Sequence, residues 1–326
     1  MAGAMRAAVQ QGYGSPDVVH VRDVERPALL DDGVLVRVHA ASINRIDWYM
    51  LRGRPWPLRF FFGLRRPKIP VVGSDFAGIV EAVGPAVQGL APGDEVFGDR
   101  NGSAAEYVCA RRCVSRKPAN LTFEEAAAVP LAGLTALQGL RDAGRLQPGH
   151  KVLVNGAGGG VGTFAVQIAS ALGAAEVDAV CSTRNVEQTR SLGANRVIDY
   201  TQEDFTASGE RYDVLFDNAG NRSWREYARV LAPNGVVVLA GVASIDNALQ
   251  LARHMVSIRV GAKRGPGSIG SYTTKPISAD LAVLREQIEA GAVRPVVERT
   301  YPLDEAAGAL RYLGSGHVRG KLVITV

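Results

Sequence analysis

Five glycines crowd into one short stretch of the chain, and their spacing is the first pattern that suggests chemistry. The stretch, residues 155–162, reads Asn-Gly-Ala-Gly-Gly-Gly-Val-Gly. An apolar run precedes it, and in residues 163–172 apolar side chains recur as in a helix. A strand, a glycine turn and a helix place backbone N–H groups and the positive helix end against a pyrophosphate. Val161 breaks the strict G-x-G-x-x-G register, but looser registers fit. We therefore expect a dinucleotide site, and the alternative is a tight structural loop.

The end of the next predicted strand, Glu176–Cys181, indicates which dinucleotide binds. NAD-binding folds usually carry an acidic residue there that holds the ribose 2′-OH. This chain instead has Ser-Thr-Arg-Asn at positions 182–185, and Asp178 comes too early in the strand. A guanidinium with hydroxyl and amide groups suits a 2′-phosphate. The pattern favours NADP(H) over NAD(H), and the alternative is a solvated helix start capped by a hydroxyl.

The remaining reactive residues do not have the spacing of a metal-ligand set or of a nucleophile–base pair. Cys109 and Cys113 form a closely spaced pair without nearby histidines, whereas zinc usually needs three or four ligands. We expect these two thiols either to be packed or to lie on the surface. The five histidines are scattered, at positions 20, 39, 150, 254 and 317. No Ser/His/Asp or paired-carboxylate arrangement indicates another chemistry.

Composition is that of an ordinary globular protein. Hydrophobic residues make up 47% of the 326 residues, and the net charge is +5, with one basic cluster near residues 59–68. No apolar run is long enough to span a membrane, and residues 1–11 lack the apolar core of a signal peptide. Three cysteines fit a reducing compartment. We expect a cytoplasmic protein, and no motif supports a nucleic-acid surface.

The order of predicted elements divides the chain into a strand-rich part and a part in which strands and helices alternate. Strands and turns dominate residues 1–121, and from Lys151 onward strands alternate with helices. Such alternation predicts an α/β fold with a doubly wound parallel sheet. We also predict a strand over 255–263, a helix over 279–290, and a final strand over 321–326. The expected domains are 1–122 joined with 296–326, and 123–295 inserted between them.

Several sequence blocks together carry a family resemblance over nearly the whole chain. They are Ala41-Ser-Ile-Asn44 with Asp47, Gly73-Ser-Asp-Phe-Ala-Gly-Ile-Val80, Gly93-Asp-Glu-Val-Phe-Gly98, Ala126-Ala-Ala-Val-Pro130, the glycine turn, Ile198-Asp-Tyr200 and Gly316-His-Val-Arg-Gly-Lys321. The chain resembles the medium-chain dehydrogenase/reductase superfamily, and within it the zinc-independent quinone oxidoreductase branch of zeta-crystallin-like and alkenal/enone reductase proteins. The resemblance implies a GroES-like β-rich catalytic domain plus a Rossmann NADP(H)-binding domain.

The resemblance also bears on metal binding. Zinc-dependent members carry a cysteine ligand in the first of these blocks and a Gly-His-Glu run in the second. This chain has Asn44 and Asp47 in the first block, and Gly73-Ser74-Asp75 in the second. The cysteine-rich structural zinc lobe is absent as well. We therefore expect no metal, and hydride addition to an already polarised acceptor rather than oxidation of simple alcohols.

Single positions of the family's motifs can be carried over to this chain. Asn44 matches a position near the nicotinamide and the substrate, and Tyr49 is placed to donate to a substrate carbonyl or simply to pack. Lys321 is expected to approach the cofactor, with a solvated lysine as the alternative. The expected catalytic residues are Asn44 and Tyr49. The expected cofactor-binding residues are Thr135, Gly159, Gly160, Val161, Gly162, Ser182, Thr183, Arg184, Asn185, Tyr200, Asn218, Gly241, Val242 and Lys321.

One segment departs from the compact members of the family. Residues 52–68 are longer and more aromatic than the corresponding loop, with Trp56, Phe60, Phe61 and Phe62. Two interpretations are open: an apolar lid for a hydrophobic acceptor, or a patch buried against a partner subunit or the domain's own core.

The resemblance implies an NADPH-dependent oxidoreductase that transfers hydride to a quinone or an α,β-unsaturated carbonyl compound. One alternative is a dedicated enoyl reductase or alcohol dehydrogenase of a biosynthetic pathway. Another is an NADPH-binding protein with little turnover. The family is usually dimeric, so we expect a homodimer that pairs through the predicted strand 255–263. The acceptor itself is not specified, because loop chemistry rather than fold selects it.

Overall fold

The computed structural model describes residues 3–241, 248–263, 265 and 267–326. The chain divides into two compact units. Unit 1 contains Met1–Leu134, Lys275–Gly291 and Pro295–Val326, and unit 2 contains Thr135–Thr274 and Ala292–Arg294. Among the described residues, no helix is long and apolar enough to cross a bilayer.

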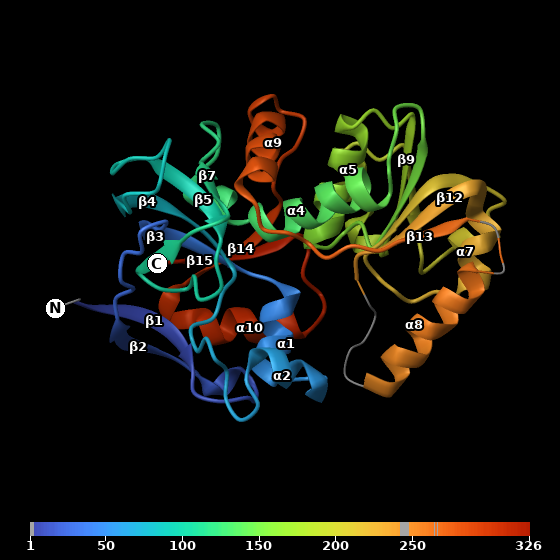
Figure 1. Cartoon of the computed structure of the whole chain (residues 1–326). Coiled ribbons are helices and arrows are strands. Elements are labelled where there is room, and N and C mark those ends of the chain that lie inside the picture. Colours follow the sequence, from blue (N-terminus) through green and yellow to red (C-terminus); the bar gives the residue numbers. More distant parts are fainter. Residues whose placement is uncertain (1–2, 242–247, 264, 266) are drawn as a thin grey trace. The chain divides into compact units, whose positions relative to one another are not determined.

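Unit 1 is built on a seven-stranded sheet (Figure 1). Its strand order is β14-β15-β3-β4-β5-β7, and β6 also pairs with β3. The strands are β3 (Val34–Ile43), β4 (Asp75–Val83), β5 (Glu95–Asp99), β6 (Tyr107–Ala110), β7 (Val114–Arg116), β14 (Val297–Pro302) and β15 (Lys321–Thr325). A separate pair is formed by β1 (Ala4–Gln10) and β2 (Val19–Glu25). This β-rich unit contains segments from both ends of the chain.

The register of β15 places Lys321 near residues of β3 and β4. β15 runs antiparallel to β3, with Leu322 opposite Ile43, so Lys321 comes beside the end of β3. β3 in turn pairs with β4, with Ser42 opposite Asp75. Backbone pairing therefore brings three distant segments together at one end of the sheet.

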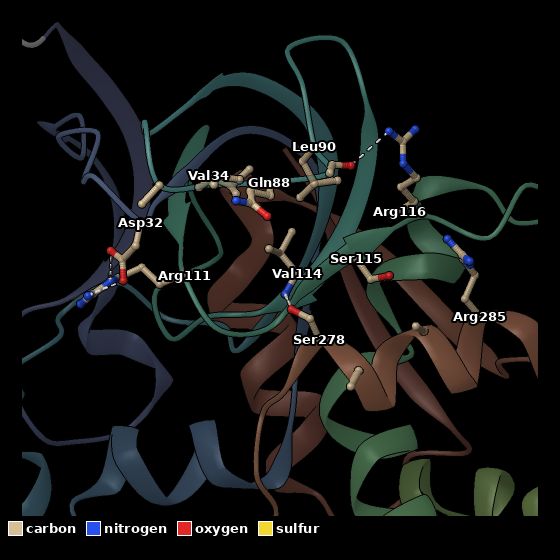
Figure 2. A pocket seen from close by; sticks show the side chains of 15 residues that line it. Asp32, Val34, Gln88, Leu90, Arg111, Val114, Ser115, Arg116, Ser278 and Arg285 are labelled. Atoms are coloured by element: carbon tan, nitrogen blue, oxygen red, sulfur yellow. Dashed lines mark hydrogen bonds and ion pairs between the residues drawn. The ribbon is translucent and has the colours of Figure 1, made fainter.

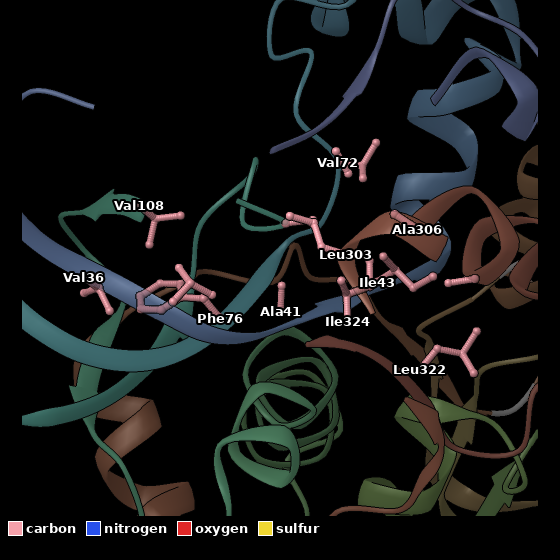
Figure 3. Packing of buried hydrophobic residues seen from close by; sticks show 14 of the residues in the cluster. Val36, Ala41, Ile43, Val72, Phe76, Val108, Leu303, Ala306, Leu322 and Ile324 are labelled. Carbon is pink, nitrogen blue, oxygen red and sulfur yellow. The ribbon is translucent and has the colours of Figure 1, made fainter. Parts of the chain in front are cut away.

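The core of unit 1 explains why β3 is almost continuously apolar. Nearly every residue of β3 is buried, which is typical of a strand covered on both faces. Figure 3 shows Val36 and Phe76 packed together, with Ile43 and Ile324 farther along the same cluster. The helices of this unit are α1 (Arg45–Arg52), α2 (Arg59–Phe62), α3 (Phe123–Ala127), α9 (Ser278–Glu289) and α10 (Ala306–Gly314). α4 (Pro130–Gln138) crosses the boundary between the units.

Unit 2 is a parallel, doubly wound sheet, and this confirms the predicted fold class. Its strand order is β10-β9-β8-β11-β12-β13, with all pairs parallel. The strands are β8 (Lys151–Asn155), β9 (Glu176–Cys181), β10 (Arg196–Asp199), β11 (Tyr212–Asp217), β12 (Leu231–Leu239) and β13 (Ser268–Gly270). The helices are α5 (Gly160–Ala171), α6 (Val186–Ser191), α7 (Trp224–Val230) and α8 (Ala248–Ala262). The winding direction reverses between β8 and β11, where ligands of such sheets bind.

The predicted strand 255–263 is wrong, because residues 255–262 belong to helix α8. Alternating Val256, Ile258 and Val260 resemble a strand, but only Ile258 is buried. Close packing decides the outcome: a Cβ at Gly261 would lie 2.6 Å from the Trp224 side chain on α7. The strand that pairs with β12 at one edge of the sheet is β13, farther along the chain. The expected dimer therefore loses the pairing strand on which it rested.

The compact units also differ from the expected domain limits. α3, the first part of α4 and α9 belong to unit 1 by their contacts, although they fall within the predicted range 123–295. α9 packs on unit 1 through specific bonds, such as Val114 N–H to Ser278 Oγ at 3.1 Å.

Candidate active site

The glycine turn of unit 2 is shaped by contacts that a side chain would prevent. Gly156 follows β8 with φ of +87°, a left-handed conformation that favours glycine. A Cβ at Gly162 would lie 2.1 Å from the Gly156 carbonyl oxygen, so the turn closes tightly onto the start of α5. At Gly158 a Cβ would lie 2.3 Å from Asn185 Nδ2. Asn185 and the turn are therefore in direct contact.

One position of the turn is open instead of crowded. A Cβ at Gly159, the N-cap residue of α5, would meet nothing closer than 3.8 Å. The first N–H groups of any helix lack acceptors within the helix. Open space over these donors fits the pyrophosphate of a dinucleotide. Of the expected residues, the turn thus brings together Gly159, Gly160, Val161 and Gly162.

The segment after β9 carries hydroxyl, guanidinium and amide side chains at residues 182–185. Asn185 Nδ2 donates to Ser182 Oγ at 3.2 Å, and Asn185 Oδ1 is buried without a partner among the described residues. Thr183 Oγ1 donates to Asp199 Oδ2 at 2.6 Å, and this bond lowers the pKa of Asp199. Arg184 is exposed at the surface of this turn.

Tyr200 lies beside the same segment. Its backbone N–H donates to the Cys181 carbonyl at 3.0 Å, and its side chain is 59% exposed. Asp178 is not available at this edge, because it is buried and accepts a hydrogen bond from the Tyr212 hydroxyl at 2.8 Å. The arrangement therefore offers hydroxyl, amide and guanidinium groups at the end of β9.

Three further expected cofactor residues have defined places in unit 2. Asn218 follows β11, and its side chain lies next to the glycine turn, 3.5 Å from a Cβ built at Gly156. Gly241 packs closely on Asn218, whose carbonyl oxygen would lie 2.2 Å from a Cβ there. Thr135 Oγ1 is 3.0 Å from Thr274 Oγ1, and the Thr135 carbonyl accepts from Tyr272. Val242 lies outside the described residues.

In unit 1, Asn44 and Lys321 meet in a buried polar cluster. Lys321 Nζ donates to Asn44 Oδ1 and, at 3.4 Å, to the Ile43 carbonyl. It also lies 3.5 Å from Asp75 Oδ2. The Lys321 residue is only 3% exposed, so the alternative of a solvated lysine is wrong. Its burial lowers its pKa, and the Asp75 charge opposes that shift.

Asp75 is the centre of this cluster. Its carboxylate accepts from Asn44 Nδ2 at 2.7 Å, from Ser42 Oγ at 2.8 Å and from the Leu131 N–H at 2.9 Å. With Lys321 nearby, this fully buried carboxylate has four polar partners, three at Oδ2 and one at Oδ1. The Asn44 amide is thus held at both ends, by Lys321 on its oxygen and by Asp75 on its nitrogen.

Two more carboxylates line the same region. Asp47 accepts from the Asn44 N–H at 2.6 Å and from Ser74 Oγ at 2.8 Å. Burial raises the pKa of Asp47 to about 6. Asp99 is opposite Asp75 across β4 and β5. Burial, together with the charges of Asp75 and Asp47, raises the pKa of Asp99 to about 8.

Tyr49 is not part of this cluster's hydrogen bonds. It lies on α1, half-buried, with the Arg45 guanidinium 5.9 Å from its ring. It is the fifth residue of α1, whereas Asn44 is the extended N-cap residue that precedes this helix. The structure therefore places the two expected catalytic side chains in different surroundings.

The two cysteines are packed, and neither is a surface thiol. Cys109 and Cys113 are both buried, and burial raises the pKa of Cys113 to about 12. Within the part of the chain that the structure describes, no group of three or more His, Cys, Asp or Glu side chains could hold a metal ion.

A cavity of about 570 Å³ lies elsewhere in unit 1. Figure 2 shows Asp32 and Arg111 on one side of it and Arg285 on the other. Two contacts join residues that line it: the Arg111–Asp32 ion pair, at 2.6 Å, and the hydrogen bond from Val114 N–H to Ser278 Oγ. None of its lining residues belongs to the expected site, so we do not assign the chemistry to it.

The aromatic segment 52–68 is not buried against its own domain. Trp56, Phe60 and Phe61 are all exposed, which excludes packing into the core of unit 1 for these three side chains.

Comparisons with known proteins agree with this architecture. The family described as "Alcohol dehydrogenase GroES-like domain" matches residues 30–138, and the family "Zinc-binding dehydrogenase" matches residues 192–324. The chain is 35% identical to a 2-methylene-furan-3-one reductase from Solanum lycopersicum, over 98% of this chain and 79% of that protein. The chain belongs to the medium-chain dehydrogenase/reductase family.

Two further members are similar to it. The NADPH-dependent alkenal/one oxidoreductase, chloroplastic, of Arabidopsis thaliana is 33% identical over 98% of this chain and 79% of that protein. The solved quinone oxidoreductase from Coxiella burnetii is 30% identical, covers 99% of this chain and all of that one, and has a TM-score of 0.84. This member of the family is thus an oxidoreductase with a GroES-like domain and a Rossmann-type sheet.

Sequence reasoning did not assign roles to four residues of the cluster. They are Ser42, Ser74, Asp75 and Asp99, of which Ser42, Ser74 and Asp75 are fully or almost fully buried. A signal existed, because Ser42 is a polar residue near the end of the apolar strand β3, and Ser74, Asp75 and Asp99 are polar residues at or next to the ends of β4 and β5. Which of them meet could only follow from the strand register.

Proposed function

We propose that this protein is a zinc-independent, NADPH-dependent reductase whose acceptor is a quinone or an α,β-unsaturated carbonyl compound. The names of the relatives support these acceptor classes for it. The observation that carries NADPH is the end of β9, where residues 182–185 contain hydroxyl, guanidinium and amide groups but no acidic side chain, and the neighbouring Asp199 carboxylate accepts hydrogen bonds from Thr183 and Thr201. A dianionic phosphate suits this group of donors.

The nicotinamide ring, when bound, supplies the hydride, and the protein supplies binding and orientation. Residues 159–162 would hold the pyrophosphate, and Ser182, Thr183, Arg184, Asn185 and Tyr200 the adenosine phosphate. Thr135, Asn218 and Gly241 are proposed on the nicotinamide side. Val242 completes the proposed set, outside the described residues.

Asn44 is the residue that we propose to act on the acceptor. Its amide has two N–H donors, of which Asp75 takes one at 2.7 Å. Lys321 donates to its oxygen, which fixes the amide plane and polarises the second N–H. That N–H can donate to the acceptor's carbonyl oxygen as negative charge develops there. Lys321 and Asp75 are then positioning residues, and Tyr49 remains a proposed second donor.

Zinc independence rests on the charges in the same cluster. The two segments in which zinc-dependent members hold ligands are joined here by the Asn44–Asp75 and Ser74–Asp47 bonds. A buried ammonium lies 3.5 Å from Asp75 Oδ2. A zinc ion on this carboxylate would be repelled by Lys321 at short range.

The test is the initial rate of NADPH and NADH oxidation with 1,4-benzoquinone, 9,10-phenanthrenequinone, a 2-alkenal and an aryl enone. We expect preference for NADPH and no loss of rate after treatment with a zinc chelator. The best acceptor decides between quinone and alkene reduction.

A carrier-linked enoyl thioester belongs in the same panel, because turnover of that substrate alone would favour a dedicated biosynthetic reductase. NADPH binding without turnover of any acceptor would overturn the enzymatic proposal and favour a binding protein. Loss of activity with chelator, restored by zinc, would overturn zinc independence.

A further inference from the structure

Residues 52–68 of unit 1 combine basic and aromatic side chains in a way found nowhere else in this sequence. They contain Arg52, Arg54, Arg59, Arg65, Arg66 and Lys68, together with Trp56 and three consecutive phenylalanines. No acidic residue occurs between Asp47 and Asp75. We call residues 52–68 the basic–aromatic segment.

Large apolar side chains of this segment point into solvent. Trp56 is 60% exposed, Phe60 58%, Phe61 74% and Leu64 58%. The Trp56 and Phe60 rings meet edge to face, with centroids 5.0 Å apart. Single exposed apolar residues are ordinary, but a contiguous group of this kind marks an interaction site.

The base of the segment is fixed to the domain, so the exposed group is presented on a defined support. The Tyr13 hydroxyl donates to the Gly63 carbonyl, and the Arg59 guanidinium lies 4.4 Å over the Tyr13 ring. Arg59 Nε also donates to the Gly53 carbonyl at 3.0 Å. Figure 1 shows α2 next to α1 at the periphery of the β-rich unit.

The cations around the exposed group are not neutralised. Arg54, Arg65, Arg66 and Lys68 are exposed, and no described carboxylate forms an ion pair with any of them. Other surface arginines of the same unit do have such partners, as in the pairs Arg6–Asp304 and Arg311–Asp17. The segment is thus a local concentration of uncompensated positive charge around aromatic side chains.

We propose that the basic–aromatic segment docks the protein on the surface of an anionic lipid bilayer. Tryptophan and phenylalanine insert at the level of the headgroups, and arginine and lysine pair with anionic lipids. A second copy of the chain is a poor occupant, because it would place two uncompensated positive surfaces against each other. A lid over a neutral acceptor would not require these four cations. The proposal does not depend on the proposed reaction.

Cosedimentation of the full chain with phosphatidylcholine vesicles, with and without phosphatidylserine, tests the proposal. We expect binding only with phosphatidylserine, and weakening as salt is raised. Trp56→Ser/Phe61→Ser and Arg65→Gln/Arg66→Gln should each lower the partition coefficient about tenfold. The control for charge is Arg111→Gln/Arg112→Gln, an adjacent exposed arginine pair elsewhere in unit 1, and the apolar control is Leu29→Ala.

The outcomes separate the possible occupants. Equal binding by wild type and the segment variants, or no binding to phosphatidylserine vesicles, overturns the proposal. Loss of a dimer in sedimentation velocity, with vesicle binding unchanged, would assign the segment to a second copy. A raised KM for apolar acceptors, with vesicle binding unchanged, would assign it to a lid. Thermal melts of every variant show that lost binding is not lost folding.

Discussion

Lys321 and Asp75 form an ion pair in the interior of the β-rich unit. Lys321 Nζ lies 3.5 Å from Asp75 Oδ2, and the two side chains are 3% and 0% exposed. They come from opposite parts of the chain and meet because β3 pairs with both β15 and β4. A buried ion pair of this kind adds little stability over an apolar pair, but removing one partner leaves the other charge buried and uncompensated.

Lys321→Met should therefore be strongly destabilising. The Asp75 carboxylate would remain buried without its counter-ion, at a cost of about 3–5 kcal/mol. Asn44 would also lose the donor on its oxygen. Urea unfolding measures the loss of stability. The loss of the donor on Asn44 is measured as kcat/KM, under conditions where the unfolding curve shows that the variant is folded.

The double variant Asp75→Asn/Lys321→Met is the control for this pair. It removes both charges, so it should recover much of the stability lost in Lys321→Met. It should not recover kcat, because the Asn44 amide still lacks its partner. Additive losses of stability in the double variant would contradict the ion-pair interpretation.

Asp47 should make stability fall as pH rises from about 4 to 6. Burial raises its pKa from 3.8 in the unfolded chain to about 6 in the folded protein. Well below pH 3.8 the group is neutral in both states, and above pH 6 the folded state carries a buried charge. Asp47→Asn should remove this trend, with a gain relative to wild type of at most about 3 kcal/mol at neutral pH.

Urea unfolding of both proteins across this pH range measures the difference. Asp23→Asn, an exposed aspartate of the same unit, provides the matched control. A difference between wild type and Asp47→Asn that does not change with pH would contradict the assignment.

Gly159→Ala and Gly162→Ala should separate binding from folding. At Gly159 the new Cβ meets only atoms at 3.8 Å or more, and φ is −89°, so the protein should fold normally. The methyl group would occupy the open space over the start of α5 and weaken the binding of NADPH about tenfold or more. Fluorescence titration with NADPH and a thermal melt measure the two effects.

At Gly162 the Cβ would lie 2.1 Å from the Gly156 carbonyl oxygen, so this variant should lose stability itself. Normal NADPH affinity in Gly159→Ala would show that the pyrophosphate does not lie over this turn.

Arg184→Ala should weaken the binding of NADPH by about 10- to 100-fold and leave the binding of NADH nearly unchanged, because only NADPH carries the 2′-phosphate. Arg190→Ala is the matched control, since Arg190 is exposed on the following helix and pairs with Glu187. Dissociation constants for both cofactors, measured by fluorescence, provide the comparison. Equal weakening of NADPH and NADH would argue against a phosphate contact at Arg184.

Local sequence determined much of the nucleotide-binding unit. The glycine turn, the strand before it and the helix after it are contiguous, so their type and order are readable without any tertiary contact. The replacement of the usual acid after β9 is equally local, and so is the position of Arg184. Fold class followed from the alternation of elements, which the parallel sheet confirms.

Tertiary structure decided the rest, because it depends on contacts between distant residues. The segment 255–263 has strand-like alternation, but packing of Gly261 on Trp224 belongs to a helix. Lys321 looks like a surface residue in sequence, and only the pairing of β15 with β3 buries it beside Asn44 and Asp75. The sequence by itself determined which chemical groups are present and the local turns that hold a nucleotide. Only the folded sheet determined which polar groups share a buried, low-dielectric space and so perturb one another's pKa.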